Sequence, residues 1–300
     1  MPKTVKKSKL GRYIDSHILS RMRNLRLKPR GRVVGDLAGD HKSTLSGFAT
    51  EFAGHRQYVP GDELKHLDWK AYYKTGKYFI KQYDVETNMI AHILLDVSES
   101  MHYGEGPGMK WEYGASLAAN LAYMIVAKRD KVSFSMFDDS VVSHMPRTQS
   151  LHQVFRMDEI MAEHTPGKKT DLNRVFMDIA NRIGRRGVVL IISDFFDDID
   201  NVLSGIQRFC FDTHDVVVFH IMHRDELTFP FDENVRFDGL EDIDPVKTDA
   251  QQIRKRYQDE VDAYLRTFTK GCEDSGVEYI LMDTSVPLEI TLAEYLIGRS

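Results

Sequence analysis

The chain has 300 residues, 42% of them hydrophobic and 10% aromatic, a composition typical of a globular protein rather than a disordered or fibrous one. Its longest apolar runs, at residues 117–127 and 216–222, are shorter than the roughly 18 to 20 residues that cross a bilayer. The two cysteines have no metal-binding spacing and imply no disulfide framework. We therefore expect a cytoplasmic protein with a sizeable core.

Positive charge is concentrated at the N-terminus. Residues 1–33 carry eleven Lys or Arg and one acidic residue, Asp15, a net charge of +10. Because the whole chain has a net charge of −5, the remaining residues carry −15 (−5 − 10 = −15). Apolar residues at helical spacing predict one basic amphipathic helix: Ile14, Ile18, Met22 and Leu25. Candidate strands follow near residues 51–58 and 78–85. We interpret residues 1–89 as an N-terminal module, a basic helix with a small β module, packed on the body.

From residue 90 onward, short apolar runs alternate with helix-patterned stretches, which is typical of parallel strands joined by helical crossovers. The predicted strands are residues 90–97, 132–137, 141–145, 188–193, 215–222 and 277–282. The predicted helices are residues 110–128, 151–163, 171–183, 202–211, 250–272 and 288–296. A short turn at residues 138–140 makes strand 141–145 an antiparallel edge. Residues 90–300 are thus predicted to form one α/β domain with a doubly wound, mostly parallel sheet.

Hydroxyl and carboxylate side chains gather where these strands end. Asp96, Ser98 and Ser100 follow the first strand of the domain, Asp194 follows strand 188–193, and Thr170 precedes a helix. Ligands of open α/β sheets collect at the carboxyl ends of the strands. Oxygen ligands of this kind suit Mg2+ or Mn2+ and disfavour Zn2+. With only two carboxylates, the ion would retain affinity for an acidic residue of a partner.

Each of these residues alone is more simply explained as a cap or a turn residue. Because all five residues lie at strand ends or helix starts, and in this order, a shared metal site is favoured over five separate caps and turns. Asp96-Val97-Ser98-Glu99-Ser100 with Thr170-Asp171-Leu172 and Ser193-Asp194 resembles the metal-ion-dependent adhesion site (MIDAS) of von Willebrand factor A domains. The resemblance implies that Ser98, Ser100 and Thr170 bind the metal directly, with Asp96 and Asp194 in supporting positions.

A second resemblance concerns two segments, Gly54 to Asp62 and His66 to Lys70, together with Leu94-Leu95-Asp96-Val97-Ser98. They are similar to the hallmark of domain-of-unknown-function family 58 (DUF58), over roughly residues 45–300. That family typically accompanies MoxR-type AAA+ ATPases and is thought to act with them as an adaptor in remodelling or maturation of client proteins, so the resemblance implies such a partner. This chain departs from the family at His55, Lys65 and Tyr73, where arginine is common, which puts an anion site there in doubt.

Within this hallmark we expect structural roles, with Asp68 bonding a backbone amide and Trp69 buried, so that the segment holds the N-terminal module to the body. We therefore predict a metal-dependent protein-binding module rather than an enzyme.

Two alternatives stay open. Asp96 after a parallel strand also suits a Mg2+-dependent phosphohydrolase with an aspartate nucleophile, but Ser98 stands where such enzymes need a second carboxylate. The basic residues 1–33 suit an anionic membrane surface, in peripheral contact, whereas the near absence of aromatic residues there argues against nucleic acid. A helix docked on the acidic body is the simpler expectation.

Overall fold

The structure is a computed structural model that describes residues 10–30, 50–62, 64–85, 89–164, 172–184, 187–231, 234–237 and 246–299. The backbone divides into two compact units, a large one of residues 1–33 and 89–300 and a small one of residues 34–88. This division corrects the expected boundary at residue 89. The N-terminal helix packs with the large unit, because its apolar face joins the core of that unit, and only residues 34–88 form a separate unit.

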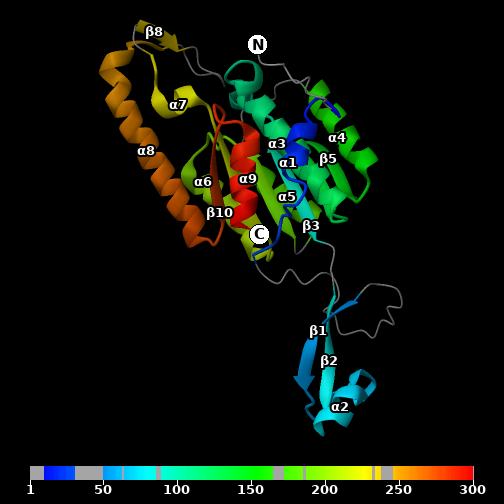
Figure 1. The fold of residues 1–300 in the computed structure, drawn as a ribbon. Coiled ribbons are helices and arrows are strands. Elements are labelled where there is room, and N and C mark those ends of the chain that lie inside the picture. Colours follow the sequence, from blue (N-terminus) through cyan, green and yellow to red (C-terminus); the bar gives the residue numbers. More distant parts are fainter. Residues whose placement is uncertain are drawn as a thin grey trace, which may run out of the picture. The chain divides into compact units, whose positions relative to one another are not determined.

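A six-stranded sheet forms the centre of the large unit (Figure 1). Its strands, in spatial order, are β10 (Glu278–Asp283), β7 (Asp215–Met222), β6 (Val188–Ser193), β3 (Ile90–Asp96), β4 (Lys131–Phe137) and β5 (Val141–Thr148). The first five run parallel, and β5 pairs antiparallel with β4 at the edge. The sequence-based fold class, a doubly wound and mostly parallel sheet with one antiparallel edge strand, is confirmed.

Helices cover both faces of this sheet (Figure 1). One face carries α1 (Ser16–Arg21), α3 (Lys110–Ala127), α4 (Leu151–Glu163) and α9 (Leu288–Gly298), and the other carries α5 (Leu172–Ile183), α6 (Ile199–Phe211) and α8 (Ala250–Asp274). Successive side chains of a strand point to opposite faces. In β6, Leu190 and Ile192 accordingly enter one core while Val189 and Ile191 enter the other, so every residue of this strand is buried.

Several short elements complete the large unit beyond those expected from the sequence. They are the 3-10 turns η2 (Glu99–His102) and η3 (Gly106–Gly108), helix α7 (Arg224–Thr228), and the antiparallel pair β8 (Asn234–Phe237) and β9 (Val246–Asp249). None of the described helices is long and apolar enough to cross a membrane.

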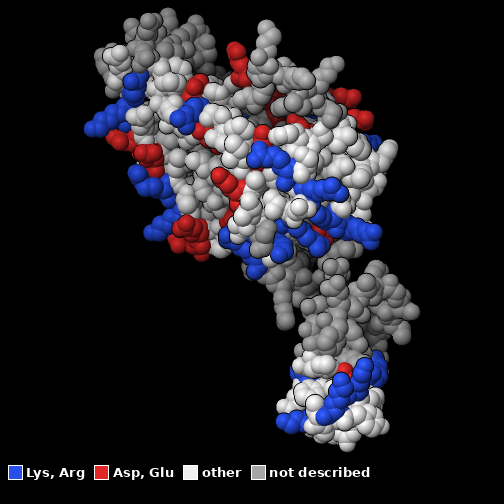
Figure 2. Space-filling view, in the orientation of Figure 1, with Lys and Arg blue, Asp and Glu red and all other residues white. Residues whose placement is uncertain are grey.

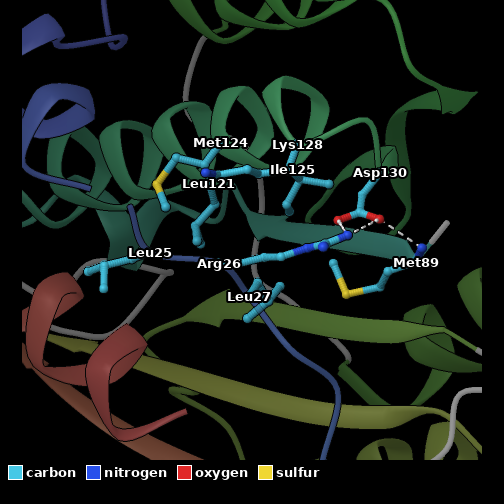
Figure 3. A pocket seen from close by; sticks show the side chains of 9 residues that line it. All are labelled: Leu25, Arg26, Leu27, Met89, Leu121, Met124, Ile125, Lys128 and Asp130. Atoms are coloured by element: carbon cyan, nitrogen blue, oxygen red, sulfur yellow. Dashed lines mark hydrogen bonds and ion pairs between the residues drawn. The ribbon is translucent and has the colours of Figure 1, made fainter. Parts of the chain in front are cut away.

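The N-terminal segment, residues 10–30, lies against the large unit. Its helix α1 begins at Ser16 because Asp15 caps it, accepting the His17 N–H at 2.8 Å. Downstream, Leu25 and Leu27 line a hollow of about 10 Å3 beside α3, where Arg26 reaches the buried Asp130 at 3.3 Å (Figure 3).

Three arginines of this segment pair with acidic residues of the body: Arg12 with Glu112, Arg26 with Asp130, and Arg30 with Glu278. Figure 2 shows basic and acidic side chains side by side on the face where the segment lies. The described part of the basic arm is thus held by the acidic body, as the simpler expectation had it.

The small unit contains β1 (Thr50–Gln57), the 3-10 turn η1 (Leu64–His66), α2 (Trp69–Thr75) and β2 (Phe79–Val85), with β1 and β2 antiparallel. Asp68 caps α2 through the N–H groups of Lys70 and Ala71, which confirms its backbone-bonding role. The expected burial of Trp69 is wrong, because this side chain is 57% exposed on the first turn of α2. Its ring contacts Tyr72 instead of a core.

Candidate metal site

The predicted site residues lie at the carboxyl ends of two neighbouring strands. Strands β3 and β6 pair directly, with Leu95 opposite Ile192, so Asp96 at the end of β3 lies beside Ser193 and Asp194 at the end of β6. Beyond Asp96 the chain turns through Ser98 and η2 into the loop that starts α3. Apolar strand interiors fix the register of both strands, and therefore the placement of the polar residues that follow them.

Hydrogen bonds join four of the five predicted residues into one cluster. Ser98 donates its backbone N–H to Asp96 Oδ1 at 2.9 Å, and the hydroxyls of Ser98 and Ser100 lie 3.0 Å apart. Ser100 Oγ donates to Asp194 Oδ1 at 3.2 Å. All four side chains are at most 7% exposed. The fifth residue, Thr170, lies outside the described residues.

The carboxyl group of Asp96 is in an unusual electrostatic setting. Burial and the negative charge of Asp194 raise its pKa to about 7, although hydrogen bonds from Ser193 and Ser98 favour the ionised form. Ser193 Oγ donates to Asp96 Oδ2 at 2.6 Å, so both carboxylate oxygens already accept a bond from the protein. Among the described residues, no positively charged side chain forms an ion pair with Asp96, so nothing there compensates the charge of its ionised form.

The sequence reasoning missed Lys110, the first residue of α3. Its ammonium donates to Asp194 Oδ2 and to Glu226 Oε1, both at 2.7 Å, and its side chain is only 3% exposed. Burial lowers the pKa of Lys110, but the two carboxylates outweigh this effect and raise it above its ordinary value. Lys110 therefore carries a permanent charge at the edge of the cluster.

A signal for Lys110 was present in the sequence, since it is the only Lys or Arg between residues 97 and 127 and it begins a predicted helix. The close approach of α3 to the sheet brings it there. Gly114 permits that approach, because a Cβ at this position would lie 3.2 Å from Met101 Cε and 3.4 Å from Ile192 Cγ2.

The donor set fits a hard divalent cation. The cluster offers hydroxyl and carboxylate oxygens alone, which is the ligand chemistry of Mg2+ and Mn2+. Within the described residues, no group of three or more His, Cys, Asp or Glu side chains is placed to hold a metal ion. The cluster around Ser98 and Ser100 contains two hydroxyls and two carboxylates. Ser98 and Ser100 would hold the ion, with Asp96 and Asp194 around them.

Known proteins resemble this chain at two levels. Among curated proteins, the uncharacterized proteins Rv1480 of Mycobacterium tuberculosis (strain ATCC 25618 / H37Rv) and Mb1516 of Mycobacterium bovis (strain ATCC BAA-935 / AF2122/97) are each 24% identical over 189 residues. The match covers 62% of this chain and 60% of the length of each relative.

Among solved structures, BatB from Bacteroides thetaiotaomicron has a TM-score of 0.42 at 13% identity, covering 71% of this chain and 100% of that one. An aerotolerance-related membrane protein from Bacteroides fragilis NCTC 9343 has 0.47 at 16%, covering 70% and 100%. The SpRpn10 VWA domain has 0.41 at 13%, covering 71% and 98%.

A family model described as "Protein of unknown function DUF58" matches residues 54–265. The matched segment includes the hallmark in the small unit, Asp68 and Trp69 among it, and the strand ends that carry Asp96 and Asp194. Since this match covers more than half of the sequence, the chain belongs to the DUF58 family.

Proposed function

We propose that the chain is a cytoplasmic, divalent-metal-dependent protein-binding adaptor and not an enzyme. In this proposal Ser98, Ser100, Thr170, Asp96 and Asp194 hold Mg2+ or Mn2+. The bound ion supplies an open coordination position for an acidic residue of a partner protein. Its physiological partner, by family resemblance, is a MoxR-type AAA+ ATPase that remodels or matures client proteins.

One observation carries the proposal: Ser98, Ser100 and Asp194 form a continuous, buried chain of oxygen atoms at the end of the sheet. Side chains that serve only as caps would each bond their own local backbone. Ser98 and Ser100 instead bond each other and a residue 94 positions away, across two strands. Hydroxyl and carboxylate oxygens gathered in this way are ligands that a small divalent cation accepts.

The arrangement around Asp96 supports a role in metal binding over a role as nucleophile. A nucleophilic aspartate must reach the phosphorus of a substrate, whereas the Asp96 side chain is 2% exposed and each of its oxygens is directed to a hydrogen-bond donor of the protein. The phosphohydrolase alternative makes a distinct prediction. Turnover of p-nitrophenyl phosphate that is abolished by Asp96→Asn would favour it over the adaptor.

Metal binding is tested by isothermal titration of Mg2+ and Mn2+ into the wild type, Ser98→Ala and Asp96→Ala. A matched control is Ser204→Ala, which removes an exposed serine from α6. We expect heat of binding in the wild type and the control, and its loss in both site variants. Equal heats in all four proteins would remove the metal assignment.

The adaptor role is tested separately by pull-down of a MoxR-type ATPase with and without chelator. We expect recovery in the presence of Mg2+, and its loss with chelator or with Ser98→Ala. Recovery that neither change affects would show that the site does not mediate this contact. Recovery of no ATPase under any condition would contradict the partnership while leaving the metal site standing.

The remaining alternative, membrane contact through residues 1–33, is less well supported. Arg12, Arg26 and Arg30 are engaged by acidic residues of the same unit, which leaves less of the arm's charge for lipid headgroups. Sedimentation with anionic vesicles at low and high salt, for the full chain and for a variant lacking residues 1–9, tests the part of the arm that precedes these pairs. Salt-sensitive binding that the deletion abolishes would favour the membrane alternative.

A further inference from the structure

A pocket of about 520 Å3 opens beside the metal site, between the end of the sheet and helix α8. Asp194 and Lys110 are among the residues that line it, so the pocket adjoins the cluster of site residues. Helix α8 provides one wall; Figure 1 shows it running along the flank of the large unit beside α6 and α7. A volume of this size is in the range typical of sites that enclose a ligand or a partner's side chain.

The walls of this pocket are aromatic. Tyr257 and Tyr264 project from α8, and Phe196, which is 63% exposed, follows the site residue Asp194. Tyr264 is fixed, because its hydroxyl donates to the Phe195 carbonyl at 2.6 Å. The Tyr257 ring packs against Phe229 at a centroid distance of 4.6 Å, while its hydroxyl has no hydrogen-bond partner among the described residues. Flat π faces and one open hydroxyl thus border the cavity.

The charge of the pocket is strongly negative. Five carboxylates line it against a single ammonium, that of Lys110: Asp194, Asp197, Asp198, Glu226 and Glu260. Lys110 pairs with Asp194 and Glu226 and offsets one of their two negative charges. His220 adds no positive charge at neutral pH, because burial lowers its pKa to about 4. A cation is therefore the complementary occupant.

The three remaining carboxylates differ in what already satisfies them. Asp198 caps α6 through the N–H groups of Asp200 and Asn201, and Asp197 accepts the Leu172 N–H at 3.3 Å. Glu260 is exposed on α8 and has neither a hydrogen-bond nor an ion-pair partner in the described part of the chain. Glu260 is thus the carboxylate best able to bind an incoming cation.

We propose that this acidic pocket binds the guanidinium group of an arginine side chain presented by a partner protein. A guanidinium is planar, stacks on aromatic rings and offers paired N–H donors to a carboxylate. Stacking on an aromatic ring of the wall, such as the exposed Phe196, and bonding to Glu260 would hold the guanidinium from two sides. Only the identity of the partner, a protein that also offers a carboxylate to the metal, rests on the proposed function. The pocket itself requires no metal.

The test is a methyl and amide NMR titration of the full chain with N-acetyl-arginine methylamide, without metal and again with Mg2+. The citrulline counterpart is the neutral comparison, since it keeps the size and planarity of the side chain but carries no charge. We expect the arginine probe, and not the citrulline probe, to shift resonances of pocket residues such as Val261 and Met222. Equal shifts from both probes, or none from either, would overturn the proposal.

Variants locate the binding on the pocket. Glu260→Gln should weaken the arginine probe at least threefold, whereas Asp259→Asn, the matched change at the neighbouring exposed position of α8, should leave it unchanged. Val261→Trp, which fills the pocket without changing charge, should abolish binding. Equal weakening by Glu260→Gln and Asp259→Asn would indicate a diffuse acidic surface and would refute the pocket.

The outcome is separable from that of the metal site. Loss of Mg2+ binding in Ser98→Ala with arginine binding intact would support the pocket, whatever becomes of the adaptor proposal. Arginine binding that is lost in Ser98→Ala as well would contradict an independent pocket.

Discussion

Replacing Lys110 by Met removes one positive charge from the edge of the proposed metal site and keeps much of the apolar volume of the side chain. In the wild type the Lys110 ammonium lies 2.7 Å from both Asp194 Oδ2 and Glu226 Oε1, with 3% of its side chain exposed. The variant leaves these two carboxylates without their shared cation. Two opposite consequences follow, one for stability and one for metal affinity.

The expected loss of stability is large without metal. Removing one partner of a buried ion pair typically costs about 3 to 5 kcal/mol, because the remaining charge stays buried without compensation. Metal affinity should change in the other direction. Two unit charges about 4 Å apart interact by about 4 kcal/mol at an effective dielectric constant of 20, and the repulsion between Lys110 and a divalent ion is of similar order. We expect Mg2+ to bind at least tenfold more tightly, which corresponds to about 1.4 kcal/mol.

Thermal unfolding at several Mg2+ concentrations, together with isothermal titration, measures both effects. Lys110→Met should have the lower Tm without metal and should gain more from Mg2+ than the wild type does. Lys131→Met, which removes an exposed lysine at the start of β4, should change neither quantity. A variant that is destabilised equally with and without Mg2+, and binds the ion no more tightly, would refute this reasoning.

Three further predictions concern other groups. At pH 8, Asp96→Asn should raise the free energy of unfolding of the metal-free protein by up to about 4 kcal/mol, as measured by urea unfolding. In this variant, added Mg2+ should no longer increase the free energy of unfolding. The pKa of Asp96 is raised from 3.8 to about 7, so stability present below pH 3.8 is lost as pH rises through 7; a variant less stable than wild type at pH 8 would contradict this. Burial lowers the pKa of His92 from 6.5 to about 3, so unfolding takes up a proton and stability falls as pH drops from 6.5 toward 3. His92→Leu should flatten the slope between pH 6 and 5 by about 1.4 kcal/mol per pH unit, and an unchanged slope would show that His92 does not titrate on unfolding. In the small unit, Asp68→Ala should lower the free energy of unfolding by about 1 to 2 kcal/mol, because α2 loses its cap. Trp69→Ser, at an exposed position, should change it by less than about 0.5 kcal/mol. Hydrogen exchange measures both, and equal effects would contradict the assigned roles.

The central sheet was predictable because the apolar pattern of each strand indicates which of its faces are buried. The continuous apolar run of Val188 to Ile192 predicts a strand covered on both faces, and the two cores on either side of β6 explain why no polar residue is tolerated there. Once parallel neighbours are assumed, the polar residues that follow such strands must meet at one edge. The sequence therefore predicts that Asp96 and Asp194 lie together, and the pairing of β3 with β6 confirms it.

Other features depend on contacts that local patterns do not encode. The ion pairs of Lys110 join residues 110, 194 and 226, which only the packing of α3 on the sheet and the position of α7 bring together. Trp69 resembles a core residue by type, yet on the first turn of α2 it faces solvent. The pairing of N-terminal arginines with the body likewise depends on tertiary placement, because charge counting alone shows only that both partners exist.

The most direct test of the account is a crystal structure grown with Mn2+, examined by anomalous difference density at the manganese absorption edge. We predict one strong peak within coordination distance, about 2.1 to 2.3 Å, of the hydroxyl oxygens of Ser98 and Ser100, the range of small oxygen-bound divalent cations. Asp96 and Asp194 should lie around the ion. Crystals in which the cluster keeps its present hydrogen bonds and shows no anomalous peak beside Ser98 would contradict the proposal that the site binds a divalent metal.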